Sequence, residues 1–227
     1  MIFPHFFEGF FRKENLQFFL GNYTYDNDTK TMTTEYATKM PTIPANYMKY
    51  LQPVDKVAFK ITQKIQYATQ MNLMPIYAGE PYQIANYGIG GQYGVHHDPH
   101  QFHGETIFQE APGHANSMFN KATGDRVATF MAYLSNVQAG GKTVFPVLGI
   151  ASTPQEGDAI FWINTASSGR LHKWTFHTGC PVIVGSKWIT NKWIQYYDQF
   201  RKFHCHLDEN VDDFEAFDRY RRQNLAV

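Results

Sequence analysis

The chain has 227 residues, of which 43% are hydrophobic and 16% aromatic. This is long enough to bury one sizeable core and too short for two large domains. Lysine plus arginine and aspartate plus glutamate number 20 each, so the chain has no net field that would attract nucleic acid or an anionic membrane. We therefore expect a small molecule or a peptide as the partner, and no nucleic acid.

Residues 1–80 are predicted to form a helical support region. Residues 1–20 have the pattern of a short amphipathic segment. A longer helix is predicted over about residues 48–71, because apolar residues recur there at spacings of three, four and seven. No apolar run approaches the roughly 18 to 20 residues that a membrane span requires, so no membrane span is expected.

Residues 81–200 have a different pattern, of short β-rich runs separated by turns that contain glycine. The runs cover residues 82–87, 127–134, 143–147, 159–163, 180–184 and 187–195. Strands at this spacing after N-terminal helices predict a mainly β fold, a sandwich or barrel with helices on one face. Residues 99–125 are predicted to form a long loop and residues 201–227 a C-terminal tail. Because there is no repeat or linker, residues 1–227 are predicted to form a single domain.

The most concentrated group of metal-binding side chains is the segment His96-His97-Asp98. On a strand, residues i and i+2 project from the same face, so His96 and Asp98 can reach one metal ion while His97 points away. A second imidazole from a distant strand would complete a two-histidine, one-carboxylate triad, which binds Fe(II) and leaves coordination positions open. A surface turn and a zinc site are the alternatives. The zinc site is disfavoured because neither cysteine has the close-spaced partner that structural zinc prefers.

His177 and Lys187 are candidates for the rest of such a site. Lys187 follows His177 by ten residues, and this even spacing allows both side chains to face one cavity. A dicarboxylate that chelates iron through its keto acid end needs a cationic partner for its far carboxylate, and a lysine ammonium is such a partner.

Several motifs in this order resemble the catalytic domain of collagen prolyl 4-hydroxylase alpha subunits, which are Fe(II)- and 2-oxoglutarate-dependent dioxygenases. The motifs cover residues 87–98, 124–134, 140–146 and 177–188. The similarity extends from about Tyr82 to Cys205. It implies a double-stranded β-helix, or jelly roll, with iron between the two sheets.

The resemblance also implies roles for individual residues. The residues that match iron ligands are His96, Asp98 and His177. Three further residues match groups that hold 2-oxoglutarate, namely Lys187, Tyr87 and Thr143. Tyr93 and Arg126 match positions in the peptide groove. On the sequence alone, these two could equally be an aromatic core contact and a surface ion-pair residue.

The implied activity is 4-hydroxylation of peptidyl proline in procollagen-like, proline-rich chains. It is coupled to oxidative decarboxylation of 2-oxoglutarate to succinate and CO2, with Fe(II), O2 and L-ascorbate as further requirements. An extended proline-rich peptide suits an aromatic groove, because polyproline II is already ordered. The alternatives are the same oxygenase chemistry on a non-collagen secreted substrate, and a non-catalytic binding or assembly homologue. A zinc hydrolase is disfavoured because the sequence has no His-Glu-x-x-His segment.

The two cysteines bear on the cellular compartment. From the sequence alone, Cys180 and Cys205 could be free thiols, a reactive pair or a disulfide. The resemblance implies that they form a disulfide, and therefore a location in the endoplasmic reticulum lumen. Sequons at Asn22 and Asn27 would fit a glycoprotein. Because no signal peptide is recognisable, we expect a fragment or an incomplete gene prediction.

Protein disulfide isomerase is a candidate partner by the same resemblance. In the collagen enzymes, regions for peptide binding and assembly precede the catalytic domain, and no such regions are recognisable in this sequence. We therefore do not expect a tetramer with that partner.

Overall fold

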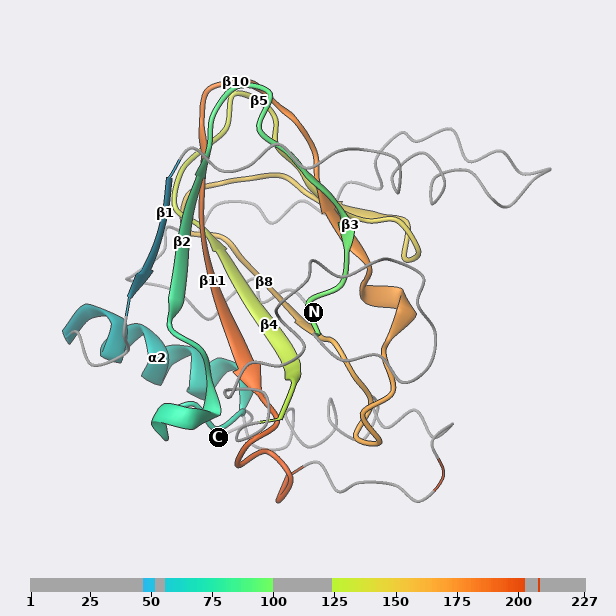
Figure 1. The fold of residues 1–227 in the computed structure, drawn as a ribbon. Helices are drawn as coiled ribbons and strands as arrows, with labels where there is room; N and C mark the ends of the chain where they lie inside the picture. The colour runs from blue at the N-terminus through green and yellow to red at the C-terminus, as the bar shows by residue number, and fades with distance from the viewer. Residues whose placement is uncertain (1–46, 52–55, 100–123, 203–207, 209–227) are drawn as a thin grey trace.

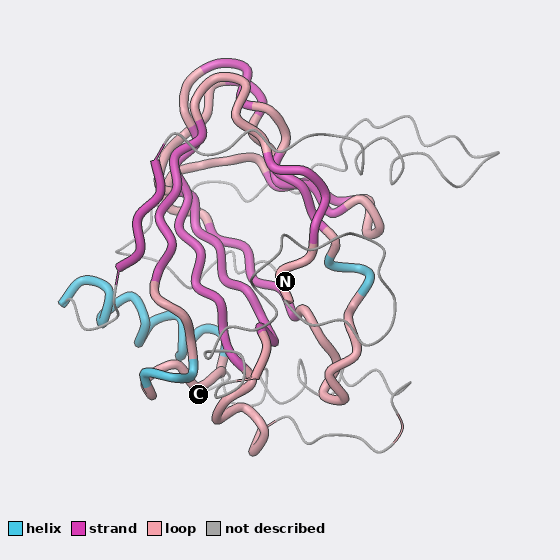
Figure 2. The backbone as a smooth tube through the Cα atoms, viewed as in Figure 1, coloured by secondary structure: helices cyan, strands magenta, loops and turns pink. Residues whose placement is uncertain are grey.

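The computed structural model describes residues 47–51, 56–99, 124–202 and 208, and most of them are strand or loop (Figures 1 and 2). In chain order the elements are β1 (Tyr47–Leu51), α2 (Lys56–Thr69), the short 3-10 helix η1 (Ile76–Ala78), β2 (Tyr82–Tyr87), β3 (Tyr93–His96), β4 (Arg126–Tyr133), β5 (Ala139–Gly140), β6 (Thr143–Phe145), β7 (Ile150–Ser152), β8 (Ala159–Ile163), the 3-10 helix η2 (Lys173–Thr175), β9 (His177–Gly179), β10 (Val182–Val184) and β11 (Lys187–Gln195).

The strands form antiparallel sheets. The larger sheet has five strands in the order β1-β2-β11-β4-β8, and a second sheet has four in the order β3-β9-β6-β7. A short β10-β5 pair lies at one end of the molecule (Figure 1). The chain leaves the larger sheet after β2 and enters the smaller one at β3, and it returns by way of β10 to β11. This arrangement confirms the predicted mainly β fold with a jelly-roll core.

The prediction of one helix over residues 48–71 is wrong at its N-terminal end. The backbone of Tyr47–Leu51 is strand β1, which pairs antiparallel with β2, and α2 begins only at Lys56. The edge of β2 offers unpaired backbone groups to this segment, and helical periodicity within one segment carries no information about a distant strand. Residues 1–20 lie outside the described residues, so the predicted amphipathic segment there stays a prediction.

The other element predictions largely agree with the structure. Strands β2, β8 and β11 have the predicted bounds, β4 begins and ends one residue earlier than expected, and β6 and β10 are shorter than predicted. The short strands β3, β5, β7 and β9 were not among the predicted runs, because two to four residues are too few to show alternation. Most of the predicted loop, residues 100–123, lies outside the described residues. The boundaries at residues 80 and 200 stay predictions.

Two hydrophobic clusters flank the five-stranded sheet, one on the face toward α2 and one on the face toward the smaller sheet. Ala128, Phe130 and Ala132 of β4 project to the face toward α2, as do residues of β8 and β11. They pack with Ala58, Ile65 and other residues of α2, which covers this side of the sheet (Figure 1). Because successive residues of a strand point to opposite faces, Thr129, Met131 and Tyr133 must face the smaller sheet.

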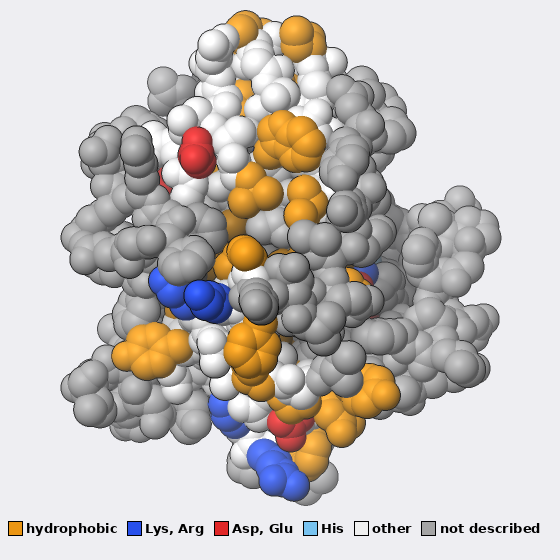
Figure 3. Space-filling view, turned by 90° about the vertical axis from the view of Figure 1, so that its left-hand side faces the viewer, with side chains coloured by type: hydrophobic (Ala, Val, Ile, Leu, Met, Phe, Trp, Pro, Cys, Tyr) orange, Lys and Arg blue, Asp and Glu red, His pale blue; other side chains and the backbone are white. Residues whose placement is uncertain are grey.

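Figure 3 shows the molecular surface on the side of α2 and β1. In the part that the structure describes, this surface has scattered hydrophobic side chains and few charged ones. Lysine and arginine side chains do not gather there into one basic field. In the same part of the chain, no helix is long and apolar enough to cross a membrane.

Candidate metal centre

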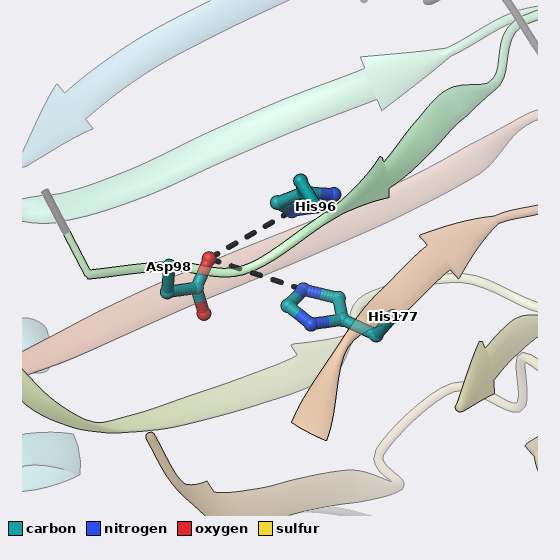
Figure 4. A group of neighbouring side chains, drawn as sticks. All are labelled: His96, Asp98 and His177. Atoms are coloured by element: carbon teal, nitrogen blue, oxygen red, sulfur yellow. Dashed lines mark ion pairs between the residues drawn. The ribbon is translucent and has the colours of Figure 1, made fainter. Parts of the chain in front are cut away.

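His96, Asp98 and His177 lie together between the two sheets. His96 ends β3 and His177 begins β9, and these two residues are paired across the smaller sheet. Asp98 follows two residues after His96, and all three side chains point toward one another (Figure 4). Asp98 Oδ1 lies 3.7 Å from His96 Nε2 and 3.8 Å from His177 Nε2. The structure thus brings together all three predicted ligands.

The backbone sets the tautomer of both histidines. His96 Nδ1 lies 2.8 Å from the carbonyl oxygen of Gly94, and His177 Nδ1 lies 2.9 Å from that of Thr175. A carbonyl only accepts hydrogen bonds, so each Nδ1 must carry the proton. Both Nε2 atoms therefore have a free lone pair directed toward Asp98, as metal ligands require.

The electrostatics favour a neutral His96 and a charged Asp98. Burial and the facing His177 lower the pKa of His96 to about 3. Burial alone would raise the pKa of Asp98, but the facing His177 and His96, together with Arg126 and the Thr129 hydroxyl, lower it. At neutral pH His96 is therefore a neutral imidazole and Asp98 a carboxylate, the protonation states in which these groups bind a metal ion.

The spacing fits one divalent ion. Two ligand atoms that are each about 2.1 Å from the same ion lie at most about 4.2 Å apart. The separations of 3.7 and 3.8 Å between the carboxylate oxygen and the two imidazole nitrogens satisfy this limit. Two nitrogens and one oxygen form the ligand set typical of non-haem Fe(II). The residues therefore fit an iron site.

Lys187 is a buried cation close to this centre. Its side chain begins β11, and only 4% of the residue is exposed. Its Nζ donates to Thr143 Oγ1 at 3.2 Å, and no carboxylate of the described residues forms an ion pair with it. Burial lowers the pKa of Lys187 to about 8. A buried ammonium without a counter-charge is costly, so this position fits an anionic ligand.

Three hydroxyl groups lie around Lys187. Tyr87 on β2 is its direct cross-strand partner, and the phenol is buried. Tyr133 donates from its hydroxyl to Thr143 Oγ1 at 2.8 Å, and its ring centroid is 5.6 Å from Lys187 Nζ. Tyr133 was not predicted as a site residue. Its alternation with the apolar Phe130 and Ala132 on β4 places it on the inner face and could have indicated this role.

Two aromatic side chains line the metal cluster on the inner side. The ring of Trp162 is 4.8 Å from that of His177, and the ring of Phe145 is 5.5 Å from it. Trp162 Nε1 is buried and has no hydrogen-bond partner among the residues that the structure describes. An acceptor atom of a ligand beside His177 would satisfy this N–H group.

The two predicted peptide-groove residues lie at the outer side of the cluster. Tyr93 is 40% exposed, and its ring is 4.3 Å from that of His96. Arg126 Nε donates to Glu80 Oε1 at 2.5 Å, and Nη1 donates to the main-chain oxygen of Asp98 at 3.2 Å. Its guanidinium also lies over the ring of Trp193, 3.8 Å from the centroid. Glu80 and Trp193 were not predicted as site residues.

His97 is not among the clustered ligands, in agreement with the alternation argument. Its ring contacts that of Phe176 at 5.5 Å, and burial lowers its pKa to about 4. Cys180 is partly buried, whereas Cys205 lies outside the described residues. The predicted disulfide therefore stays a prediction.

The profile of the "2OG-Fe(II) oxygenase superfamily" matches residues 82–195, which is half of the chain. The chain belongs to this superfamily. This membership implies Fe(II), 2-oxoglutarate and O2 as cofactor and cosubstrates, and the His–Asp–His cluster agrees with it.

Curated relatives of this oxygenase support the same family. The rat "Prolyl 4-hydroxylase subunit alpha-1" is 39% identical over 155 residues, which is 68% of this chain and 27% of the relative. The chicken "Prolyl 4-hydroxylase subunit alpha-2" is 42% identical over 139 residues, or 61% of this chain and 23% of the relative. The chain thus spans about a quarter of the length of these relatives.

A solved structure has the same fold. The viral collagen prolyl hydroxylase vCPH from Paramecium Bursaria Chlorella virus-1, in complex with 2-oxoglutarate, superposes with a TM-score of 0.51. It is 28% identical, and the match covers 66% of this chain and 79% of the viral one. This similarity supports the jelly-roll assignment made from the two sheets.

Proposed function

We propose that this oxygenase hydroxylates prolyl residues of proline-rich peptides, with collagen-like chains as the preferred class. The observation that carries the proposal is the pairing of a His–Asp–His cluster with a buried lysine that has no carboxylate partner among the described residues. The first group fits Fe(II), and the second fits the far carboxylate of 2-oxoglutarate. The names of the relatives support the prolyl substrate.

In this proposal His96, Asp98 and His177 hold the iron. The carbonyl oxygens of Gly94 and Thr175 fix the two imidazole rings, so that both Nε2 atoms stay directed at one point. When bound, Fe(II) with 2-oxoglutarate and O2 supplies the oxidation that hydroxylates C4 of a prolyl ring, while 2-oxoglutarate is converted to succinate and CO2.

Lys187, Thr143 and Tyr87 hold the far carboxylate of 2-oxoglutarate, and Tyr133 joins them. The Tyr133 hydroxyl and Lys187 Nζ both donate to Thr143 Oγ1, so that oxygen accepts two hydrogen bonds and its own proton is available for a carboxylate. Binding of the dianion restores a full charge to Lys187 by supplying the missing counter-charge. Phe145 and Trp162 exclude water from the side of His177.

Tyr93 and Arg126 form the peptide-binding side in this proposal. The exposed ring of Tyr93 offers a flat apolar surface next to a metal ligand, which suits a proline ring of an extended peptide. Arg126 is held by Glu80 and by the ring of Trp193. It therefore positions the main chain at Asp98, and its remaining N–H groups are available to peptide carbonyls.

The test is succinate formation from 2-oxoglutarate by the Fe(II)-loaded protein with ascorbate, in the presence and absence of a Pro-Pro-Gly repeat peptide. We expect turnover that the peptide stimulates, and one 4-hydroxyproline for each succinate. If the peptide does not change the rate of succinate formation, the oxygenase assignment stands and the collagen-like substrate is rejected. A protein that binds Fe(II) and 2-oxoglutarate but forms no succinate with any proline-rich peptide would be a binding homologue.

The proposal extends to the cellular setting. We propose an endoplasmic reticulum location with a disulfide between Cys180 and Cys205, ascorbate as the reductant that maintains Fe(II), and glycosylation at Asn22 and Asn27. The pairing of the cysteines in the related alpha subunits supports this setting only by resemblance. Non-reducing peptide mapping of the protein from a secretory host tests the disulfide and glycans directly.

A further inference from the structure

Asp98 has two carboxylate oxygens in different environments. Oδ1 faces both histidines at nearly equal distances, 3.7 and 3.8 Å. Oδ2 accepts a hydrogen bond from the Thr129 hydroxyl at 2.5 Å. The carboxylate thus presents Oδ1 to the metal position, whereas Oδ2 is hydrogen-bonded to Thr129 of β4.

Asn164 determines the direction of the Thr129 hydrogen bond. Its Nδ2 donates to Thr129 Oγ1 at 2.9 Å, so the threonine oxygen is an acceptor on that side. A hydroxyl has a single proton, and the carboxylate of Asp98 can only accept one. The Thr129 proton is therefore directed to Asp98 Oδ2.

The strand pairing makes this chain of hydrogen bonds rigid. Thr129 lies opposite Trp162 of β8 and Trp193 of β11, in the middle of the larger sheet. The Asn164 backbone donates to Val127 and accepts from His172, at 2.8 and 2.9 Å. Thr129 and Asn164 are each 1% exposed, so water does not compete for either side chain.

We propose that Thr129, oriented by Asn164, holds Asp98 in single-oxygen coordination and so keeps one metal position free for O2. This inference rests on the proposed function. His96, His177 and Asp98 Oδ1 would hold Fe(II) together with two oxygens of 2-oxoglutarate, and these five ligand atoms would leave a sixth position for O2. A carboxylate that bound through both oxygens would close that last position. Thr129 and Asn164 are positioning residues, because they act only through Asp98.

The test measures the number of water molecules bound to Mn(II), under conditions in which no reaction occurs. Mn(II) and 2-oxoglutarate are added under anaerobic conditions, and the relaxation of bulk water protons reports whether Mn(II) keeps a coordinated water. In the wild-type protein we expect one position open to water. In Thr129→Val, which removes the hydroxyl and keeps the shape, we expect the coordinated-water contribution to fall by about half or more as Oδ2 binds.

Two further variants control for a structural effect. Thr129→Ser keeps the hydroxyl and should retain the wild-type relaxation. Asn164→Ala keeps Thr129 but removes the hydrogen bond that orients its hydroxyl, so the coordinated-water contribution should fall by an intermediate amount. It also carries the test if Thr129→Val does not fold. If folded Thr129→Val has the water relaxation of the wild-type protein, the inference is overturned. If Thr129→Val does not fold, the same result in Asn164→Ala overturns it.

Failure of the inference is separable from failure of the proposed function. If the wild-type protein binds neither Mn(II) nor 2-oxoglutarate, the proposed function is wrong and the inference falls with it. If the wild-type protein binds both and folded Thr129→Val keeps its coordinated water, only the positioning role is rejected. As a second readout, Thr129→Val should consume more 2-oxoglutarate for each hydroxyproline formed than Thr129→Ser does.

Discussion

The two faces of the five-stranded sheet are built from alternate residues of the same strands and differ in what they bury. On β4, the face toward α2 presents Ala128, Phe130 and Ala132, whereas the inner face presents Thr129, Met131 and Tyr133. The outer face, toward α2, carries one hydrophobic cluster. The inner face carries a second hydrophobic cluster and also buries hydrogen-bonded polar groups near Lys187 and Asp98. Both faces therefore contribute to stability, whereas the candidate chemistry belongs to the inner face.

The largest expected effect is between the inner face and the smaller sheet, at a metal ligand on β9. His177→Ala removes one of three ligand atoms, so 2-oxoglutarate turnover should fall by more than about 100-fold, beyond the usual effect of a residue that only supports a ligand. Succinate formation and Fe(II) binding measure the effect. His97→Phe is the matched control, because His97 is a neighbouring histidine outside the cluster and should keep turnover. Equal losses in both variants would reject the ligand assignment.

The outer face should show the opposite behaviour. Phe161 on β8 is fully buried in the core beneath α2, and Phe161→Ala should lower the free energy of unfolding by about 3 to 5 kcal/mol. Urea denaturation measures this loss. Turnover per folded molecule, measured well below the melting temperature, should stay unchanged. A large drop in turnover of the folded variant would show that the two faces are not independent.

Substitution of Lys187 should affect both stability and binding, because its buried charge destabilises the folded protein but is expected to bind 2-oxoglutarate. Lys187→Met should weaken 2-oxoglutarate binding about 10- to 100-fold, the range for losing a charged hydrogen bond. The folded state holds the pKa of Lys187 at about 8, below its value of 10.5. The charge is therefore destabilising below about pH 8, and the variant should gain up to roughly 3 kcal/mol at pH 7.

Two measurements at pH 7 test these effects: the free energy of unfolding of the ligand-free proteins, and their dissociation constants for 2-oxoglutarate. Lys187→Arg keeps the charge and should not gain stability. If Lys187→Met loses stability together with 2-oxoglutarate affinity, then Lys187 has a structural partner and the site for the far carboxylate lies elsewhere.

The pH dependence of cosubstrate binding follows from the same lysine. The dianion binds the protonated ammonium, so affinity should be constant below about pH 8 and should fall above it, by up to about tenfold for each pH unit. Calorimetry with Mn(II) in place of Fe(II), from pH 7 to 9.5, measures this fall. Lys187→Arg should flatten the profile, because arginine stays charged throughout this range. A wild-type profile that is level to pH 9.5 would contradict the assignment.

The sequence predicted the strands β8 and β11 well because each is long enough to form a β-rich run of its own. The local motif around His96 and Asp98 indicated the cluster, although Asp98 lies two residues beyond the end of β3. The strand β1 was missed because its structure depends on pairing with β2, whose partner residues are 31 to 39 positions away in the sequence. Helical and strand periodicities both fit its apolar residues, and only the partner decides between them.

The supporting residues of the site were missed for a related physical reason. Thr129, Tyr133 and Asn164 act through hydrogen bonds to partners on other strands. In the sequence each is a common residue within an apolar run. Only the register of β4 with β8 brings Asn164 close to Thr129, and register is a property of the folded sheet.

The smallest expected effect is at Tyr93 on β3 of the smaller sheet, at the outer side of the metal cluster. Tyr93→Ala removes a ring that is 40% exposed and packs on His96, so the KM for a proline-rich peptide should rise about 2- to 10-fold, the usual contribution of one aromatic contact. The KM for 2-oxoglutarate should not change, because the proposed function assigns that ligand to Lys187 and Thr143. Tyr77→Ala is the matched control, because Tyr77 is an exposed tyrosine whose ring packs on Tyr197 instead. Steady-state kinetics with each substrate varied in turn separate the two constants. If the two KM values rise together, Tyr93 acts through His96 and the metal, and the peptide-binding side must be sought elsewhere.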